Sequence, residues 1–378
     1  MLGSATPSLE CFHQVQAGRW RRFYLPERVN ALALPEVVLE DMRQALVQDG
    51  LSVGLIQAIR RALGADEQVM LFLNRRGYAP MLRCEHCGWQ ALCAQCETSM
   101  VAHVNVRELV CHHCGASERL PVRCPSCGQG ELLMLGMGTQ KLEQVLKAQF
   151  PQARVLRIDS DAFSTSKQFE QALEQVHRRE VDIILGTQWL SKGHHFPHLN
   201  LVAIVDADQA FYSLDFRSEE RLAQMLVQVS GRAGRERRGQ VWVQTKQPEH
   251  PVFNSLVEAY AVQAKRLYAQ RIESGLPPVS AQVLLFARHK ELARVMQVLM
   301  MTKEGALSEG IGENWLWLGP APAVIARKGG IYSAQLLLQA PSKATLQRDL
   351  PRVYAWFEAQ AKALNVRYGL DVDPLWLE

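Results

Sequence analysis

Eight of the nine cysteines stand in four Cys-x-x-Cys pairs within one short stretch of the chain. The pairs are Cys84 with Cys87, Cys93 with Cys96, Cys111 with Cys114, and Cys124 with Cys127. A Cys-x-x-Cys turn lets two thiolates reach one metal ion, and two such turns close a tetrahedral site with no open position for water. The sequence therefore predicts two structural zinc sites, each with four cysteine ligands.

The four pairs can be shared between two ions in three ways. The interval between Cys96 and Cys111 is close to the ~15 to 20 residues of a common zinc ribbon, which favours a nested arrangement. The inner ion would then take Cys93, Cys96, Cys111 and Cys114, and the outer ion Cys84, Cys87, Cys124 and Cys127. Each metal could supply ~10 to 16 kcal/mol of apparent folding free energy. Metal binding would thus explain how residues 84–127, which show little apolar periodicity, can fold.

Other roles for these residues fit the pattern less well. A thioredoxin-like redox site needs one reactive pair near the start of a βαβ unit, not four clustered pairs. His86, His112 and His113 could replace a cysteine as ligand, but eight thiolates already fill two sites. Cys11 stands alone and is interpreted as a small packing residue.

A second pattern, Gln-x-x-Gly-Arg-x-Gly-Arg, lies near the end of an expected helix and contains Gln228, Arg232 and Arg235. Guanidinium groups suit bidentate phosphate contacts, and glycines let the backbone approach a ligand. Such arginines can stabilise the charge of a γ-phosphoryl transition state. If the pattern stood alone, an exposed basic turn would be the better interpretation.

Two further motifs lie upstream of this pattern. Gly186, Thr187 and Gln188 follow an expected strand, and the carboxyl edge of a doubly wound sheet is where ligand contacts lie. Near the N-terminus, Thr6 precedes Pro7, which in isolation predicts only the start of a helix.

Short β-rich apolar runs alternate with amphipathic helical stretches, which is typical of βαβ units and predicts an α/β fold with a parallel sheet. One helix is expected after Gly136 and Gly138, with Thr139 as its N-cap. The expected strands are residues 69–73, 154–158, 182–185, 201–205 and 241–245.

The composition is that of an ordinary globular protein. Of the 378 residues, 48% are apolar and 21% are charged, which excludes a wholly disordered or fibrous chain. The net charge of +4 is too small to indicate nucleic-acid binding by itself. No window holds the ~18 apolar residues of a membrane span, and the N-terminus lacks signal-peptide features. We therefore expect a cytoplasmic protein with no membrane partner, where clustered cysteines indicate metal or redox chemistry.

The order of four motifs resembles that of superfamily 2 helicases. SAT at residues 4–6, FLNRRGY at 72–78, GTQWLSKGHHF at 186–196 and QVSGRAGR at 228–235 follow the order of motifs III, IV, V and VI. The cysteine-rich insertion between motifs IV and V, with LNRRGYAP and KGHHFP, resembles the PriA family of replication-restart helicases. The resemblance runs from Leu2 to the closing LDVDP.

The resemblance implies a RecA-like second helicase lobe with a parallel sheet, an inserted double zinc-binding module with four cysteines at each site, and a small α+β C-terminal domain. Residues 1–20 would be a remnant of the first lobe carrying motif III, and residues 84–127 the zinc insertion. Residues 21–83 and 128–272 would form the two sections of the second lobe. Residues 273–378 would form a C-terminal domain that binds DNA and partners.

The resemblance also implies two groups of site residues. Those facing the ATP phosphates would be the catalytic residues Gln228, Arg232 and Arg235. Those contacting nucleotide, or coupling it to the DNA strand, would be Ser4, Thr6, Gly186, Thr187 and Gln188.

PriA-like proteins recognise stalled or abandoned replication forks, unwind DNA 3′→5′ with ATP and help to reload the replicative helicase. The implied partners are forked and single-stranded DNA, single-stranded-DNA-binding protein, primosome proteins and the replicative helicase loader. The implied location is the nucleoid within the cytoplasm.

The chain departs from the family pattern because it contains neither a GxxxxGK[ST] phosphate loop nor a DExH motif. Hydrolysis needs the phosphate cradle and magnesium carboxylate of the first lobe. ATP and Mg²⁺ are therefore expected only together with that lobe, and this polypeptide alone is not expected to be an ATPase. A Met start within motif III suggests a truncated gene, a late start codon or a split protein.

Three hypotheses compete. The first is a helicase fragment that needs the missing lobe, and the second is a non-enzymatic, zinc-stabilised DNA-binding module that recruits the primosome. A third, a nuclease or transferase that uses Asp206 and Asp208 as metal ligands, lacks an evident third carboxylate.

Overall fold

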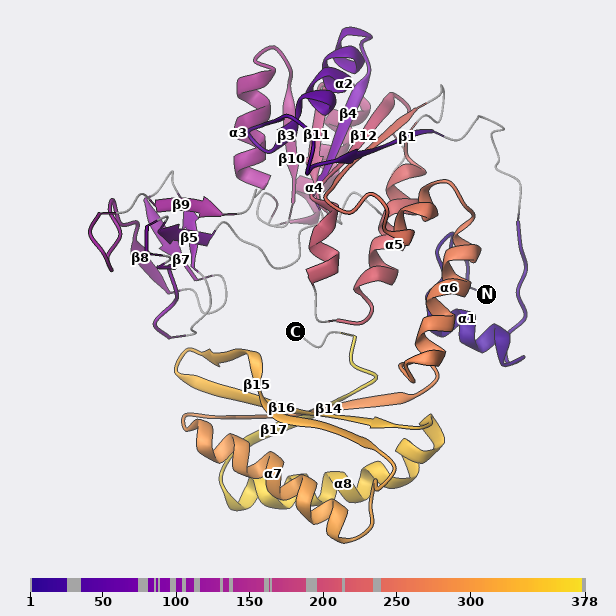
Figure 1. Ribbon diagram of the computed structural model, residues 1–378, viewed down its shortest axis with the longest axis vertical. Coiled ribbons are helices and arrows are strands. Elements are labelled where there is room, and N and C mark those ends of the chain that lie inside the picture. The colour runs from indigo at the N-terminus through magenta and orange to yellow at the C-terminus, as the bar shows by residue number, and fades with distance from the viewer. Residues whose placement is uncertain are drawn as a thin grey trace. The chain divides into compact units, whose positions relative to one another are not determined.

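The chain forms two compact units, one from Met1–Tyr78 with Met137–Tyr268 and one from Ala79–Gly136 with Ala269–Glu378. Most of the helices and strands of each unit are labelled in Figure 1. The computed structural model describes residues 2–25, 35–73, 81–84, 86–87, 89–95, 100–103, 107–111, 116–129, 132–135, 139–159, 163, 165–187, 196–212, 215–233 and 239–375.

A six-stranded parallel sheet organises the first unit. Its central strands β4 and β12 are almost wholly buried, as expected for a parallel sheet with helices on both faces. The prediction of an α/β fold with a parallel sheet is confirmed. The order of its strands is β1 (Glu36–Asp41), β13 (Gln240–Thr245), β12 (Leu199–Val205), β4 (Gln68–Leu73), β11 (Ile183–Gly186) and β10 (Val155–Ile158).

Helices cover both faces of this sheet because alternate residues of each strand point to opposite sides. In β4, Val69 and Leu71 join the core beneath α2 (Val53–Gly64) and α3 (Thr139–Gln149). Met70 and Phe72 join the core on the other face. The helices of that face are α1 (Leu9–Gln16), α4 (Ser166–His177), α5 (Ser218–Ser230) and α6 (Tyr260–Glu273).

Short elements complete this unit. The hairpin strands β2 (Val47–Gln48) and β3 (Leu51–Ser52) lead into α2, and the Ser52 hydroxyl caps that helix by accepting the Leu55 N–H at 3.1 Å. Thr139 is the first residue of α3, and its hydroxyl lies 2.5 Å from Asp159 Oδ2. Two 3-10 helices, η2 (Ala207–Tyr212) and η3 (Pro251–Leu256), follow β12 and β13.

The cysteine-rich segment forms a small antiparallel sheet whose core is thin. Leu82, Met100 and Leu109 are buried there together with Cys93 and Cys111. The order of its strands is β8 (Ser117–Arg119), β7 (Glu108–Val110), β6 (Val101–His103), β5 (Met81–Cys84) and β9 (Leu132–Leu135).

The C-terminal residues form a four-stranded antiparallel sheet backed by two helices, which confirms the small α+β domain that the family resemblance implied. α7 (Leu292–Ser308) and α8 (Lys343–Ala363) pack on one face of it. Gly369 of the edge strand lies against the Phe286 ring, where an added Cβ would come within 2.5 Å of it. The order of the strands is β15 (Leu316–Lys328), β16 (Ile331–Ala340), β14 (Ala281–His289) and β17 (Arg367–Val372).

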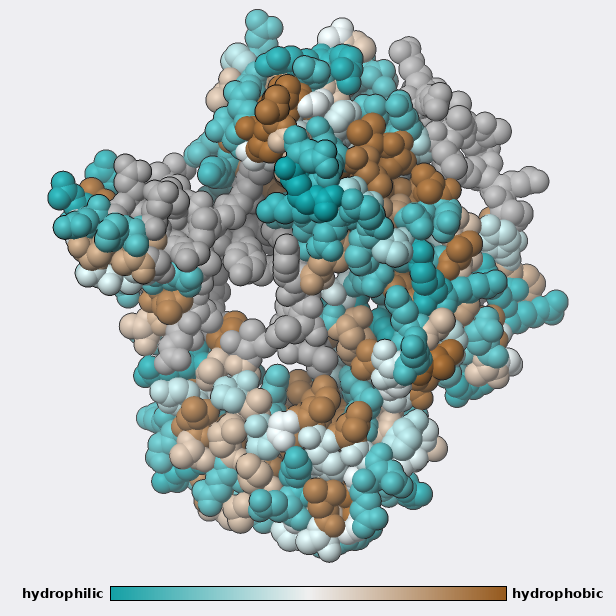
Figure 2. Space-filling model, in the orientation of Figure 1, coloured by the Kyte–Doolittle hydropathy of each residue, from teal (hydrophilic) through white to brown (hydrophobic). Residues whose placement is uncertain are grey.

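The face drawn in Figure 2 is largely hydrophilic, with hydrophobic patches scattered over it. Among the described helices, none combines the length and the apolar character needed to cross a membrane.

Candidate functional site

Four cysteines come together at the entry and exit of the cysteine-rich segment. The Sγ atoms of Cys84, Cys87, Cys124 and Cys127 all lie within 4.8 Å of one another. Cys84 Sγ is 3.7 Å from Cys127 Sγ, and Cys87 Sγ is 3.6 Å from Cys124 Sγ. These distances are far longer than a disulfide bond of ~2.05 Å. The cluster is a set of four thiol groups available to one ion.

The separations fit a tetrahedral metal site. Four sulfurs that each lie ~2.3 Å from one zinc ion are about 3.8 Å apart. Cys84 and Cys124 are buried while Cys87 is exposed, so the cluster lies at the surface of its small sheet. With four protein ligands no coordination position is left for water, and zinc there would be structural rather than catalytic.

The local fold brings the two halves of the cluster together. Cys84 ends β5 and pairs with Leu132 of β9, which returns from the other end of the segment. The Cys84 N–H donates to the Trp89 carbonyl at 2.7 Å and closes the first turn. The second turn closes where the Gly128 N–H donates to the Cys124 carbonyl at 2.9 Å, and the φ of +71° at Gly128 explains the glycine.

This cluster contains the outer ligand set of the predicted nested arrangement, and zinc binding is supported by it. For the inner set, Cys93 and Cys111 are both buried in one core. Cys96 and Cys114 lie outside the described residues, as do His112 and His113. The second site therefore stays a prediction.

The SAT residues contact the helix that carries the Gln-x-x-Gly-Arg pattern. Gln228 Nε2 donates to Thr6 Oγ1 at 2.7 Å, and Thr6 is only 5% exposed. The Ser4 hydroxyl accepts the Thr6 N–H at 3.1 Å and shapes the turn before α1. Arg232 lies in the turn after α5 and is buried, while Arg235 lies outside the described residues. Residues far apart in sequence are thus joined directly.

Helix α1 is held against α5 and α6 by contacts that the sequence did not predict. Glu220, buried in α5, accepts the Leu9 N–H at 2.9 Å. The Tyr260 hydroxyl donates to the Pro7 carbonyl at 3.2 Å, and burial raises the pKa of Tyr260 above its usual range. His13 Nδ1 and the Tyr268 hydroxyl are 2.7 Å apart. Glu220 looks like an ordinary first-turn acid in the sequence, so no local signal reveals it.

The Gly-Thr turn lies at the carboxyl edge of the parallel sheet, as predicted. Gly186 ends β11 and pairs with Phe72 of β4. Thr187 follows it and is 9% exposed, and Gln188 lies outside the described residues. Within the described residues no hydrogen bond joins Thr187 to Thr6 or Gln228.

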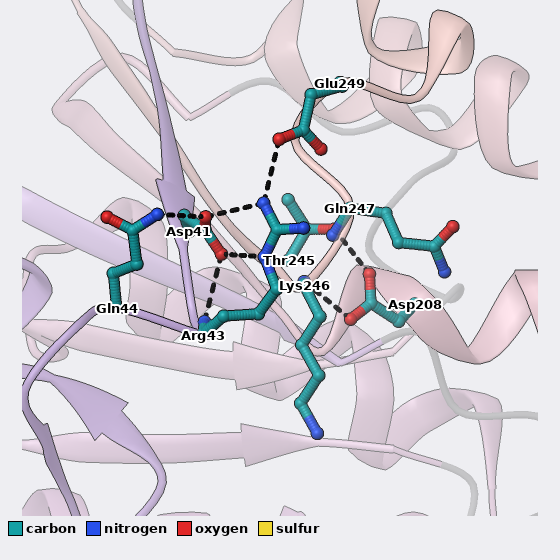
Figure 3. Close-up of polar contacts among 8 residues, drawn as sticks. All are labelled: Asp41, Arg43, Gln44, Asp208, Thr245, Lys246, Gln247 and Glu249. Carbon is teal, nitrogen blue, oxygen red and sulfur yellow. Dashed lines mark hydrogen bonds and ion pairs between the residues drawn. The ribbon is translucent and has the colours of Figure 1, made fainter.

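The Asp208 carboxylate accepts hydrogen bonds from residues at the end of β13 (Figure 3). One carboxylate oxygen accepts the Thr245 hydroxyl, and the other accepts the Lys246 N–H at 2.7 Å. Among the described residues the only group able to hold a metal with three or more ligands is the cysteine cluster. The metal-dependent nuclease hypothesis therefore loses support.

A second polar group in Figure 3 lies at the surface. Arg43 donates to both Asp41 carboxylate oxygens at 2.7 Å and to Glu249 at 2.8 Å. The Arg43 guanidinium holds the pKa of Asp41 and of Glu249 below their usual ranges. This ion-pair group connects the chain after β1 to the chain after β13.

Three family models match successive parts of the chain. "PriA DNA helicase Cys-rich region (CRR) domain" matches residues 93–119, "Helicase conserved C-terminal domain" residues 128–237, and "Primosomal protein N C-terminal domain" residues 272–375. The first includes the inner cysteine pairs, and the second includes both the Gly-Thr turn and the arginine pattern. The fold and the cysteine cluster thus define a helicase-type C-terminal lobe with a zinc-binding insertion.

Curated relatives agree with these matches. The replication restart protein PriA of Haemophilus influenzae is 44% identical over 99% of this chain and 51% of its own length. The PriA proteins of Bacillus subtilis and Treponema pallidum are 34% and 35% identical, with 47% and 56% of their lengths covered. The chain belongs to the PriA family and spans about half the length of the curated relatives that it matches.

Proposed function

We propose that this chain supplies the second lobe, the zinc module and the C-terminal domain of a PriA-type replication-restart helicase. That helicase would recognise stalled or abandoned forks, unwind DNA 3′→5′ with ATP and assemble the primosome. The observation that carries the proposal is the contact of Thr6 with Gln228, which joins the SAT turn to the helix leading to Arg232. A direct link between these two motifs supports a motor, in which the nucleotide site must be coupled to the segments that contact DNA.

Gln228 and the two arginines that follow α5 in the sequence would have different roles. Gln228 is held by Thr6, so its orientation depends on the SAT turn. Arg232 and Arg235 would face the phosphates, where guanidinium groups can stabilise charge developing on a transferred phosphoryl group. ATP with Mg²⁺ would supply that group, bound to a first lobe that carries the phosphate loop. Ser4, Gly186, Thr187 and Gln188 would link the nucleotide state to the DNA strand.

The five parts expected from the sequence are proposed as functional regions. Residues 84–127 would engage DNA and partner proteins. Residues 273–378 would contact DNA, single-stranded-DNA-binding protein and the loader of the replicative helicase. Residues 1–20 would belong functionally to the first lobe, although Leu9 and Phe12 pack in the core of the parallel-sheet unit.

The first experiment follows DNA-stimulated ATP hydrolysis and fork-DNA binding by the zinc-loaded chain in the same samples. Fork binding without hydrolysis supports the proposal. Hydrolysis that survives removal of contaminating ATPases would mean that the chain holds a complete nucleotide site. Absence of fork binding would count against a replication-fork role.

A second experiment uses the chain joined to a first lobe with a GxxxxGK[ST] loop. We expect Arg232→Ala and Arg235→Ala to abolish hydrolysis with zinc content intact. Arg232→Lys should also be impaired, because an ammonium group cannot make the bidentate contact. Arg60→Ala, an exposed arginine of α2, is the matched control and should hydrolyse ATP normally.

A non-enzymatic, zinc-stabilised recruiting module remains the alternative. It predicts that the joined protein binds forks and primosome proteins but does not unwind. Strand displacement on forks with a single 3′ or 5′ arm separates the two proposals and tests the direction of unwinding.

A further inference from the structure

Residues 6–9 run along helix α5 in the opposite direction to it. Thr6 contacts Gln228 near the end of α5, and the Leu9 N–H contacts Glu220 in the first turn of that helix. Positions 220 and 228 are separated by ~12 Å along a helix that rises 1.5 Å per residue. The short segment that follows the SAT turn is therefore held at two points that span most of the length of α5.

Glu220 is a buried carboxylate at the first of these points. Its Oε1 atom accepts both the Leu9 N–H at 2.9 Å and Gln224 Nε2 at 3.3 Å. Leu9 is the first residue of α1, where a negative charge is favoured by the helix dipole and by backbone N–H groups that lack a partner within the helix. Because Leu9 is fully buried, loss of Glu220 would leave this N–H without an acceptor, which is costly.

Two side chains hold the same segment from its other side. Tyr260 of α6 donates its hydroxyl to the Pro7 carbonyl at 3.2 Å, between the two contact points on α5. Gln224, which donates to Glu220, also hydrogen-bonds the Tyr260 side chain. The Pro7 carbonyl and the Leu9 N–H are thus bound by one connected group of side chains from α5 and α6.

An ion pair extends the alignment by one more residue. Arg217, buried at the start of α5, has its Nε atom 3.5 Å from Oε1 of Glu10. The contacts at 6, 9 and 10 therefore fall at 228, 220 and 217, in strictly reversed order. Sliding the segment by one helical turn along α5 would break all of them together.

We infer that Glu220 is a positioning residue of the ATPase, which holds residues 6–9 in register on α5 so that Thr6 reaches Gln228. The inference rests on the proposed function, which places Gln228 and Arg232 at the ATP phosphates. Glu220 acts through Thr6 and Gln228 on the turn after α5, which carries Arg232. Because a misplacement of ~1 Å can cost about a hundredfold in rate, a residue remote from the phosphates can control hydrolysis in this way.

ATP hydrolysis by a two-lobe protein tests the inference. The first lobe is supplied by the part of the Haemophilus influenzae relative that this chain does not match, joined ahead of Leu2. We expect Glu220→Ala to lower kcat about tenfold with KM for ATP changed by less than about twofold, because nucleotide binding is kept while the arginine turn is misplaced. Glu220→Gln keeps an oxygen acceptor and should restore most of the rate. Glu219→Ala is the matched control, since this acid of the same turn makes no hydrogen bond or ion pair with the described residues, and it should leave kcat unchanged.

A double-mutant cycle separates positioning from a general loss of stability. In a Thr6→Ala background the contact with Gln228 is already lost, so Glu220→Ala should lower kcat by no more than about a further twofold. Effects that multiply in full would overturn the inference, because Glu220 would then act independently of Thr6. An unchanged kcat for Glu220→Ala alone would overturn it as well.

Tyr260→Phe tests the same alignment with a smaller risk to folding. The variant removes only the hydroxyl that donates to the Pro7 carbonyl and keeps the ring in the core. We expect kcat to fall about threefold, and to fall no further when Thr6→Ala is already present. A normal kcat for Tyr260→Phe together with Glu220→Ala would contradict the positioning role.

Hydrogen–deuterium exchange measures the alignment in the chain itself, without the first lobe. The Leu9 amide should exchange at least about tenfold faster in Glu220→Ala, and at the unmodified rate in Glu219→Ala. Equal Leu9 protection in the two variants would overturn the inference. If Arg232→Ala abolishes hydrolysis while the Glu220 and Tyr260 variants are normal, the positioning role fails and the proposed function stands; normal hydrolysis by Arg232→Ala would instead overturn the proposed function.

Discussion

The parallel-sheet unit and the zinc module are held together by different forces. In the parallel sheet, strands β4, β11 and β12 are buried between two apolar layers. In the zinc module, short strands enclose a thin core in which Cys93 and Cys111 replace larger apolar residues. Burial of apolar area stabilises the first, whereas metal–thiolate bonds must stabilise the second.

Because different forces stabilise the two regions, we expect each region to unfold without unfolding the other. Removing a ligand from the cysteine cluster should unfold the module and spare the sheet, and a cavity in the sheet should not release zinc. Each prediction below tests one side of that separation.

The largest effect is expected from Cys124→Ser, which removes a buried ligand of the outer cluster. Loss of one structural zinc site should cost the module ~10 to 16 kcal/mol of apparent folding free energy. Zinc per chain, measured by mass spectrometry, should fall by one ion, and amides of β5 and β9 should lose their protection. Cys11→Ser is the control and should retain all zinc. Unchanged zinc in Cys124→Ser would show that the cluster is not a metal site.

A smaller effect is expected from Leu71→Ala in β4, where the side chain is completely buried. The lost contacts and the cavity should cost ~2 to 5 kcal/mol of unfolding free energy. Urea unfolding, followed together with zinc content, should show destabilisation with no loss of zinc. Leu39→Ala on the edge strand β1, where Leu39 is 37% exposed, should cost clearly less. Zinc release by Leu71→Ala would break the proposed independence.

The smallest effect concerns the ion pair at the amino edge of the sheet. Arg154 donates to both oxygens of Asp182, at 3.0 and 2.6 Å, and these bonds hold the Asp182 pKa below its ordinary 3.8. A lowered folded pKa means that the stabilisation is present above the unfolded pKa and is lost as pH falls through the folded pKa. Because the pair is partly exposed, it should contribute only ~0.2 to 1 kcal/mol.

Urea midpoints of Asp182→Asn and the unmodified chain measure this contribution. The two should differ at pH 7 and converge as the pH is lowered below about 4. Glu174→Gln removes a more exposed pair with Arg178 and should show almost no difference at either pH. A difference for Asp182→Asn that grows on acidification would contradict the assigned direction of the pKa shift.

Much of the parallel sheet could be predicted because its buried strands are continuous apolar runs. Residues 69–73, 201–205 and 241–245 fall within β4, β12 and β13. β1 was not predicted, since EVVLED holds only three apolar residues between acidic ones, and the strand pairs only with β13, at the edge of the sheet. The local sequence pattern predicts an edge strand poorly when pairing with a single neighbouring strand supplies most of its stability.

The candidate site also contains one part that local sequence spacing predicts and another part that it does not. Cys-x-x-Cys spacing is a local property, so the outer ligand set could be read from the sequence. The contacts of Glu220 with Leu9 and of Tyr260 with Pro7 join residues more than two hundred positions apart, and no spacing rule reports them. The pairing of Thr6 with Gln228 could be anticipated only through the family resemblance, not from either residue alone.

The pairing of β5 with β9 has a consequence for the order of folding. Met81 lies opposite Leu135, so the two ends of the long segment that separates β4 from α3 in the sequence are held side by side. Until that pairing forms, β4 must find β11 across a long, flexible loop, and closing such a loop costs entropy. Metal capture before the sheet assembles would shorten this search. We therefore expect the parallel sheet to refold faster in zinc than in its absence, although its described strands hold no cysteine ligand.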